Sequence, residues 1–251
     1  MTTRRLSAAL GIGALLVVAF LTGCTTAAAP ASTAAQHPVS HSPSLASTPT
    51  VAPSPPSAGM SATANAAQLA VYSAPDGTAT ETLSNPQPSG APLVLLVAAT
   101  KGSWLQVHLA QRPNGSTGWI KAAAVTLHTL AYSLKASTEN RTLALYKHGA
   151  LVKTFTVATG TGGTPTPHGS FYITELLAPT NAGYGPYAFG LSAFSDALTS
   201  FGGGPGQIGL HGTDDAASIG KAASHGCIRL ANPDITELAK LLPLGTPITI
   251  G

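Results

Sequence analysis

The sequence predicts a mainly β protein in which two folded units, with one or two short helices, follow a disordered N-terminal tether. Three observations support this class. From residue 67 onward, short apolar runs alternate with turns that contain Gly or Pro, which is typical of small β units. Residues 25–66 are almost entirely Ala, Ser, Thr, Pro and Gly, a composition that cannot bury a core. A segment near residues 232–242 carries the start and stop signals of a helix.

The first element is an export signal. A charged start, Met1–Arg5, precedes an apolar run from Leu6 to Leu21, and this order predicts a secretory signal peptide over residues 1–23. The run is shorter than the roughly twenty residues that a bilayer span needs, so we do not expect a permanent transmembrane helix. The pair Arg4-Arg5 also hints at twin-arginine export.

The residues that close this run, Leu21-Thr-Gly-Cys24, resemble the lipobox of bacterial lipoproteins. The resemblance implies cleavage behind Gly23 and a lipid on Cys24, which would anchor an exported protein to the outer face of the cytoplasmic membrane. The alternative is an ordinary signal peptide whose cleavage site contains a Cys. We expect residues 24–66 to be a Pro-rich spacer that reaches from the membrane into the cell wall.

The chain contains two cysteines, Cys24 and Cys227. In an exported protein an even count first suggests a disulfide. Lipidation of Cys24 would remove that pairing and leave Cys227 as a lone, reactive thiol. The net charge of +3 and a charged fraction of 8% give no basic stripe of the kind that nucleic-acid binding requires.

Residues 67–128 are expected to form a small β unit. Apolar runs at residues 69–72, 93–97, 104–109 and 118–120 are separated by turn residues. The stretches Gly102–His108, Arg112-Pro-Asn-Gly115 and Gly118-Trp119-Ile120 resemble bacterial SH3-like modules, which implies a targeting or spacing role. Trp104 and Trp119 could form a face for a sugar or peptide, although aromatic residues in a small barrel more often belong to its core.

Residues 129–251 are expected to form the second unit. Strands are predicted near residues 132–134, 142–146, 150–158 and 171–174, with a hairpin turn at residues 147–149. Residues 179–206 form a long stretch with the length of a binding lid, and it carries Tyr184, Tyr187, Phe189 and Phe194. The helix is predicted from Asn232 as N-cap, with Pro233 at its first position, to Leu242.

The chemistry of the chain centres on two short segments. His211 ends a short apolar strand, and Ser224-His-Gly-Cys-Ile-Arg-Leu230 begins thirteen residues later. A thiol with a pKa of about 8.5 needs a neighbouring imidazole to act as a nucleophile at neutral pH. His211 and His225 are both candidates, and local spacing does not choose between them. The weaker alternative is a zinc site in which His211, His225 and Cys227 bind the metal together with Asp214 or Asp215.

The run Ser224–Cys227, together with Arg229, Asn232 and the upstream pair His211-Gly212, resembles the signature of L,D-transpeptidases of the YkuD family. The resemblance covers about residues 132–251 and implies a β-sandwich-like catalytic domain. It includes the loop Thr164–Phe171, in which His168 stands where the family usually has a small residue.

The resemblance assigns a role to each matching residue. Cys227 is the expected nucleophile and His211 its base, oriented by the Gly212 carbonyl, and the amides of Gly226 and Cys227 are the expected oxyanion donors. Ser224 and His225 are expected to shape the pocket, and Tyr187, Arg229 and Asn232 to contact the substrate. For Arg229 the alternative is packing against the helix start.

The implied reaction acts on peptidoglycan stem peptides. Cys227 would attack the carbonyl of the third stem residue, expel D-alanine and form a thioester. A diaminopimelate amine from a second stem would then yield a cross-link between two third-position residues. Water as acceptor would make the protein an L,D-carboxypeptidase, and loss of activity would leave a wall-binding lipoprotein. We expect a monomer with no metal or other cofactor.

Overall fold

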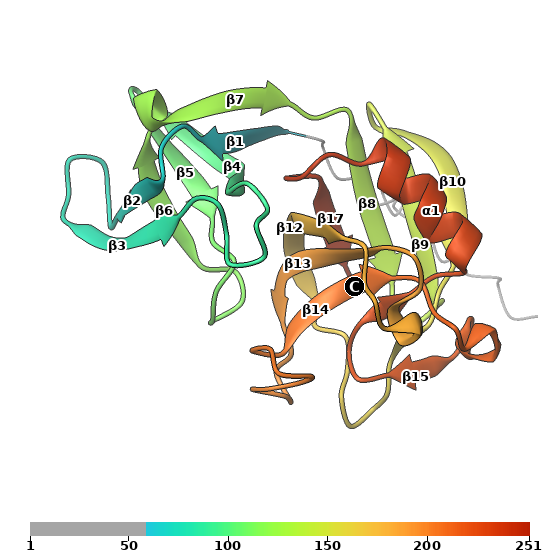
Figure 1. Cartoon of the computed structure of the whole chain (residues 1–251). Coiled ribbons are helices and arrows are strands. Elements are labelled where there is room, and N and C mark those ends of the chain that lie inside the picture. Colours follow the sequence, from blue (N-terminus) through green and yellow to red (C-terminus); the bar gives the residue numbers. More distant parts are fainter. Residues whose placement is uncertain (1–58) are drawn as a thin grey trace, which may run out of the picture. The chain divides into compact units, whose positions relative to one another are not determined.

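The computed structural model describes residues 59–251, and this part of the chain is mainly β (Figure 1). The described residues all belong to one compact unit. The predicted signal peptide, Cys24 and the tether up to residue 58 lie outside the described residues. Within residues 59–251 no helix is both long enough and apolar enough to cross a bilayer.

The first sheet has seven strands in the order β3-β2-β6-β5-β4-β1-β7, and all its neighbouring strands are antiparallel. Its strands are β1 (Met60–Ala64), β2 (Gln68–Tyr72), β3 (Ala79–Ser84), β4 (Val94–Lys101), β5 (Trp104–His108), β6 (Thr117–Lys121) and β7 (Val125–Thr129). Trp104 is buried, as expected of a core residue, and Trp119 is half-buried. The SH3-like character of this unit stays a prediction.

The first sheet begins earlier than the sequence predicts. The expected tether extends to residue 66, but β1 (Met60–Ala64) lies between β4 and β7 and buries Ser61, Ala62 and Ala64. Composition alone misses this strand because its buried residues are the same small types that fill the tether. In a strand held on both sides, backbone pairing stabilises the segment without large side chains.

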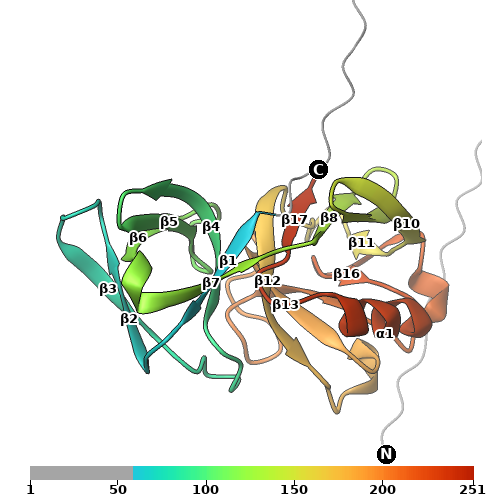
Figure 2. The same cartoon turned by 90° about the horizontal axis from the view of Figure 1, so that it is seen from above.

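The second sheet has eight strands in the order β10-β9-β8-β17-β12-β13-β14-β16. Its strands are β8 (Tyr132–Ser137), β9 (Thr142–Lys147), β10 (Ala150–Thr156), β12 (Gly169–Leu177), β13 (Ala188–Phe194), β14 (Gln207–His211), β16 (Ile228–Arg229) and β17 (Pro247–Ile250). A two-stranded sheet pairs β11 (Thr159–Gly160) with β15 (Ala222–Ser224). Figure 2 shows β8, β17 and β12 side by side.

β13 (Ala188–Phe194) lies within the stretch that the sequence presents as one long lid. Most of this strand is buried, and it pairs with both β12 and β14. Gly190 and Ser192 interrupt its apolar pattern, which is why no strand is predicted there. The lid expected over residues 179–206 is therefore two separate loops, before and after β13.

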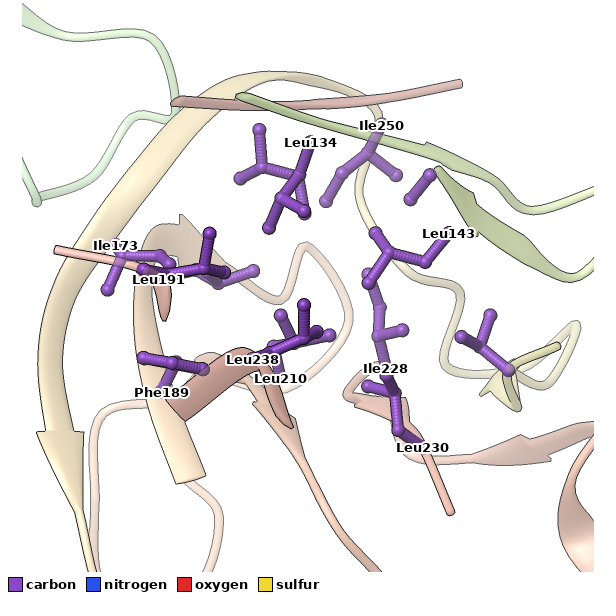
Figure 3. Close-up of a cluster of buried hydrophobic side chains, with 14 of the residues drawn as sticks. Leu134, Leu143, Ile173, Phe189, Leu191, Leu210, Ile228, Leu230, Leu238 and Ile250 are labelled. Atoms are coloured by element: carbon purple, nitrogen blue, oxygen red, sulfur yellow. The ribbon is translucent and has the colours of Figure 1, made fainter. Parts of the chain in front are cut away.

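The hydrophobic core of the second unit joins the sheet to α1 (Asn232–Leu241), the one α-helix within residues 59–251. Ile235 and Leu238 of α1 are fully buried there, and Figure 3 shows Leu238 among core side chains such as Leu210 and Phe189. The described part of the chain also has three short 3-10 turns, at Ala122–Ala124, Ala182–Tyr184 and Ala216–Ser218. The helix agrees with the sequence except at its cap.

The N-cap of α1 is Ala231 rather than Asn232, which is the first residue of the helix. The Asn232 side chain turns toward the chain that follows β14, where its Oδ1 accepts a hydrogen bond of 2.9 Å from Thr213 N–H. A side chain already bound across two segments is not available to cap its own helix.

Candidate active site

Two parallel strands place the predicted nucleophile beside the predicted base. In β14 and β16, Leu210 lies opposite Ile228 and His211 opposite Arg229. Cys227 directly precedes β16, so this register puts it beside Gly209. The Gly209 N–H donates a hydrogen bond of 3.3 Å to Cys227 Sγ.

Gly209 leaves the space between the thiol and the imidazole open. His211 Cδ2 lies 3.4 Å, and Cys227 Sγ 3.7 Å, from the point where a Cβ on Gly209 would stand. His211 is two residues further along the strand and so leaves the sheet on the same side. Any larger residue at position 209 would put its side chain between nucleophile and base.

His211 is buried, with 3% of its surface exposed, and its ring is held by its neighbour's backbone. The Nδ1 atom lies 2.5 Å from the carbonyl oxygen of Gly212. Because a carbonyl only accepts hydrogen bonds, Nδ1 carries the proton and Nε2 keeps a free lone pair. The orienting role expected for Gly212 is thus present in the geometry.

Burial sets the protonation of both groups. Desolvation lowers the pKa of His211 to about 4, against the opposing hydrogen bond to Gly212, and the positive charge of Arg229 lowers it further. Desolvation also raises the pKa of the Cys227 thiol, while the Gly209 N–H and Arg229 act in the opposite direction. At neutral pH the resting pair is therefore a thiol beside a neutral imidazole.

Ser224 fixes the turn that carries Cys227. Its Oγ donates a hydrogen bond of 2.5 Å to the Cys227 carbonyl and accepts one of 3.1 Å from the Gly226 N–H. Gly226 has a φ of +117°, and a Cβ there would stand 3.0 Å from Ile208 Cδ1, so only glycine fits without strain. Since the Gly226 N–H is engaged by Ser224, the structure does not offer it as an oxyanion donor, and the Cys227 amide stays the predicted one.

His225 is the other candidate base. It is exposed, and its ring packs on that of Phe201 with centroids 5.1 Å apart. His225 lines a pocket together with His211 and Cys227, and its role in shaping that pocket stays a prediction.

Cys227 lies where two pockets meet. One has a volume of about 330 Å³ and is lined by residues of β12, β13 and β14 and by Phe201, Gly202, Gly204 and Pro205. The other has a volume of about 360 Å³ and extends past Ser224, His225 and Arg229. Both pockets share Tyr184, Phe201, Gly202, His211 and Cys227. Cys227 thus lines both cavities.

Of the two neighbouring tyrosines, Tyr184 belongs to the site and Tyr187 does not. The ring of Tyr184 lies 4.7 Å from that of His211, measured between centroids, and lines both pockets. Tyr187, the predicted substrate contact, instead packs against the hydrophobic core, and it lines neither pocket at Cys227. The two tyrosines are three residues apart in a loop, and this spacing does not show which ring faces Cys227.

Arg229 lines the second pocket beside Cys227. Its Nε is buried and has no hydrogen-bond partner among the described residues. A buried, unpaired guanidinium nitrogen is costly unless a ligand or water satisfies it. Arg229 therefore lies in the pocket wall, and its contact with a substrate carboxylate stays a prediction.

Two further predicted residues lie behind the site. Asn232 joins α1 to Thr213 and closely contacts the backbone at Gly185 and Gly212, so it supports the His211 segment and lines neither pocket. His168 lies in the loop before β12, where its Nε2 and Thr138 Oγ1 are 2.9 Å apart. Among residues 59–251 no cluster of three His, Cys, Asp or Glu side chains could hold a metal ion.

Comparison with known proteins places this site in a family. The family model of the L,D-transpeptidase catalytic domain, YkuD, matches residues 131–250. YkuD of Bacillus licheniformis, named as an L,D-transpeptidase, is 38% identical over 122 residues, which are 49% of this chain and 67% of that protein. YkuD of Bacillus subtilis is 37% identical over 123 residues, which are 49% of this chain and 68% of that protein.

A solved structure from Bdellovibrio bacteriovorus, Bd1075, is 26% identical with a TM-score of 0.40, and the match covers 48% of this chain and 48% of that one. The chain thus spans about half the length of that protein and about two thirds of each Bacillus relative. On the family match and the two Bacillus relatives, this chain belongs to the YkuD family of L,D-transpeptidases.

Proposed function

We propose that the chain is a peptidoglycan L,D-transpeptidase that links two third-position stem residues through a thioester on Cys227. The observation that carries the proposal is the place of Cys227, which lies beside a neutral His211 at the junction of two pockets. An acyl donor and an acceptor amine need separate approaches to one sulfur, and two pockets supply them.

The first half-reaction forms the thioester. The Nε2 of His211 removes the thiol proton as Sγ attacks the carbonyl carbon of the third stem residue. The tetrahedral oxyanion is within reach of the Cys227 amide, which we assign as its donor. As the intermediate collapses, the C–N bond breaks, and His211 returns the proton to the departing amine of D-alanine.

The second half-reaction transfers the acyl group from Cys227 to an acceptor amine. The amine of a diaminopimelate residue on another stem attacks the thioester carbon while His211 Nε2 removes its proton. The C–S bond then breaks and the proton passes to the sulfur, which restores the thiol. The sum is one new amide bond and one released D-alanine, with no oxidant, reductant or nucleotide consumed.

Arg229 supplies the charge that such a substrate needs. Stem peptides carry carboxylates, and Arg229 lines the second pocket together with Cys227. Arginine presents planar, paired donors to a carboxylate. We assign Arg229 to the binding of a stem carboxylate.

The proposal is tested with a defined tetrapeptide donor, offered with and without an amine-bearing second stem, and the products are read by mass. A cross-linked product with release of D-alanine is expected when both are present. Tripeptide alone in both mixtures would show that water is the acceptor and would replace the proposal by L,D-carboxypeptidase activity. If no donor gives any product, the wall-binding lipoprotein would replace the proposed enzyme.

A further inference from the structure

The loop that forms one wall of both pockets is fastened to the first sheet. We define the active-site loop as residues 195–206, which connect β13 to β14. Its neck is closed by a hydrogen bond of 2.8 Å from Ser195 N–H to the Gly206 carbonyl. Its tip is a tight turn in which Phe201 and Gly204 exchange two backbone hydrogen bonds. From this tip, Phe201 and Gly202 line both pockets at Cys227.

Arg112, in the loop between β5 and β6, crosses the neck of the active-site loop. Its guanidinium donates hydrogen bonds of 2.8 and 3.0 Å to the carbonyls of Ser195 and Leu198 on one arm. It donates a further bond of 2.8 Å to the carbonyl of Pro205 on the other arm. One side chain from the first sheet thus ties the two arms of the loop together.

Asn114 holds the strand end from which the loop leaves. Its Nδ2 donates a bond of 2.7 Å to the Phe194 carbonyl, and its Oδ1 accepts one of 2.9 Å from the Phe194 N–H. The amide therefore pairs with Phe194 as a neighbouring strand would. The guanidinium of Arg112 also stacks over the Phe194 ring, 5.0 Å from its centroid.

Gly206 shows how closely these groups are packed. It has a φ of +75°, and a Cβ there would collide with the Leu198 carbonyl and stand 3.3 Å from Arg112 Nη2. The neck leaves no space for a side chain because the Leu198 carbonyl occupies it, and Arg112 packs beside that carbonyl. The next residue, Gln207, begins β14, the strand that ends at His211.

We infer that Arg112 and Asn114 are positioning residues of the active site, and that the first sheet is part of the machinery that binds the donor. The expected effect on acylation kinetics rests on the proposed function. The two residues contact neither Cys227 nor His211 and act through the active-site loop, which carries the Phe201 wall of the pockets. Residues 67–128, for which the sequence predicts a targeting or spacing role, would thus also position the active-site loop.

The chemistry favours arginine at this point. Three carbonyls on two arms require several donors in a fixed plane, which a guanidinium provides and an ammonium does not. Arg112→Lys keeps the charge but loses the fork, so it separates geometry from electrostatics. Lys101→Ala, an exposed change on β4 of the same sheet, is the matched control.

The experiment uses the full chain as wild type, Arg112→Ala, Arg112→Lys, Asn114→Ala and Lys101→Ala. Amide hydrogen exchange of the active-site loop is measured by mass spectrometry. Acylation by a carbapenem, measured over a range of concentrations, separates the half-saturating concentration from the limiting rate. Thermal unfolding verifies the fold of each variant.

Arg112→Ala and Asn114→Ala should each show several-fold faster exchange in residues 196–205, with unchanged exchange in β8 and β9. The half-saturating concentration should rise several-fold while the limiting rate stays within about twofold. Arg112→Lys should fall between wild type and Arg112→Ala, and Lys101→Ala should match wild type.

Unchanged exchange in the active-site loop, or exchange that rises throughout the chain, would overturn the inference. So would an unchanged half-saturating concentration with a loosened loop. If Arg112→Ala does not fold, Arg112→Lys and Asn114→Ala decide the question. If the wild type is never acylated, the proposed function fails, and the exchange data alone judge the fastening of the loop.

Discussion

The ring of His211 is fixed by the carbonyl of the residue that follows it, because its Nδ1–H donates a 2.5 Å hydrogen bond to Gly212. This bond selects the tautomer whose free nitrogen, Nε2, can take a proton. Asn232 holds the same stretch of backbone from the helix side through Thr213. The base is therefore oriented before any substrate arrives, and its protonation sets the pH range of the reaction.

The pH profile of Cys227 acylation should have an acid limb near pH 4. Only neutral His211 can accept the thiol proton, and its pKa is lowered to about 4, so the base form persists as pH falls from 7 to 5. The alkaline limb should lie above the usual range of a thiol, because burial raises the pKa of Cys227. Acylation rates at low carbapenem concentration, measured across pH, report both limbs. An acid inflection near 6.5 would contradict the assignment.

Substitution of Arg229 should change both substrate binding and this profile. Arg229→Gln removes a positive charge that lowers the pKa of His211 and of Cys227, so both inflections should move to higher pH. It also removes the donor to the stem carboxylate, so the KM for the donor should rise about tenfold or more.

Arg229→Lys is the matched variant, since it keeps the charge without the paired donors. Its pH inflections should stay near those of the wild type while the KM for the donor still rises. An Arg229→Gln variant with wild-type KM and wild-type inflections would return this residue to a packing role.

The two tyrosines should behave differently when each is replaced by leucine. Tyr184→Leu removes a wall of both pockets and a ring 4.7 Å from His211, so acylation should slow by about tenfold or more. Tyr187→Leu alters packing at the edge of the core and should lower the thermal midpoint by a few degrees while acylation stays unchanged. Equal acylation losses in both variants would argue against this division.

Cys24→Ala should release the protein from membranes. The proposal of a lipid anchor rests on Leu21-Thr-Gly-Cys24 and predicts that this variant moves to the soluble fraction after cell fractionation. Carbapenem acylation of the released protein should match the wild type. Continued membrane retention of Cys24→Ala would refute lipid anchoring through this residue.

The sequence predicts the parts of the fold that leave a local signal. The helix has Pro233 near its start and Pro243 beyond its end, and β14 and the turn at Cys227 carry the family signature. Strands built from small or interrupted patterns, such as β1 with Ala62 and β13 with Gly190, leave none. Periodicity cannot detect a strand whose stability comes from pairing on both sides.

In the active site, too, some residues have a local signal in the sequence and others do not. Cys227, His211 and Gly212 come from short motifs, and the structure brings them together. The engagement of the Gly226 N–H by Ser224 and the inward turn of Tyr184 depend on loop geometry. Arg112 acts on residues more than eighty positions away, and an exposed arginine in a turn of one sheet carries no local sign of a target in another unit.

The most direct test of the central claim is the intact mass of the protein after incubation with a carbapenem. The wild type should gain the mass of one inhibitor molecule, located on the peptide that contains Cys227. Cys227→Ala should gain none, and His211→Gln should gain it much more slowly at neutral pH. An adduct of equal amount on Cys227→Ala, or equally fast labelling of His211→Gln, would contradict a nucleophile at Cys227 that depends on His211.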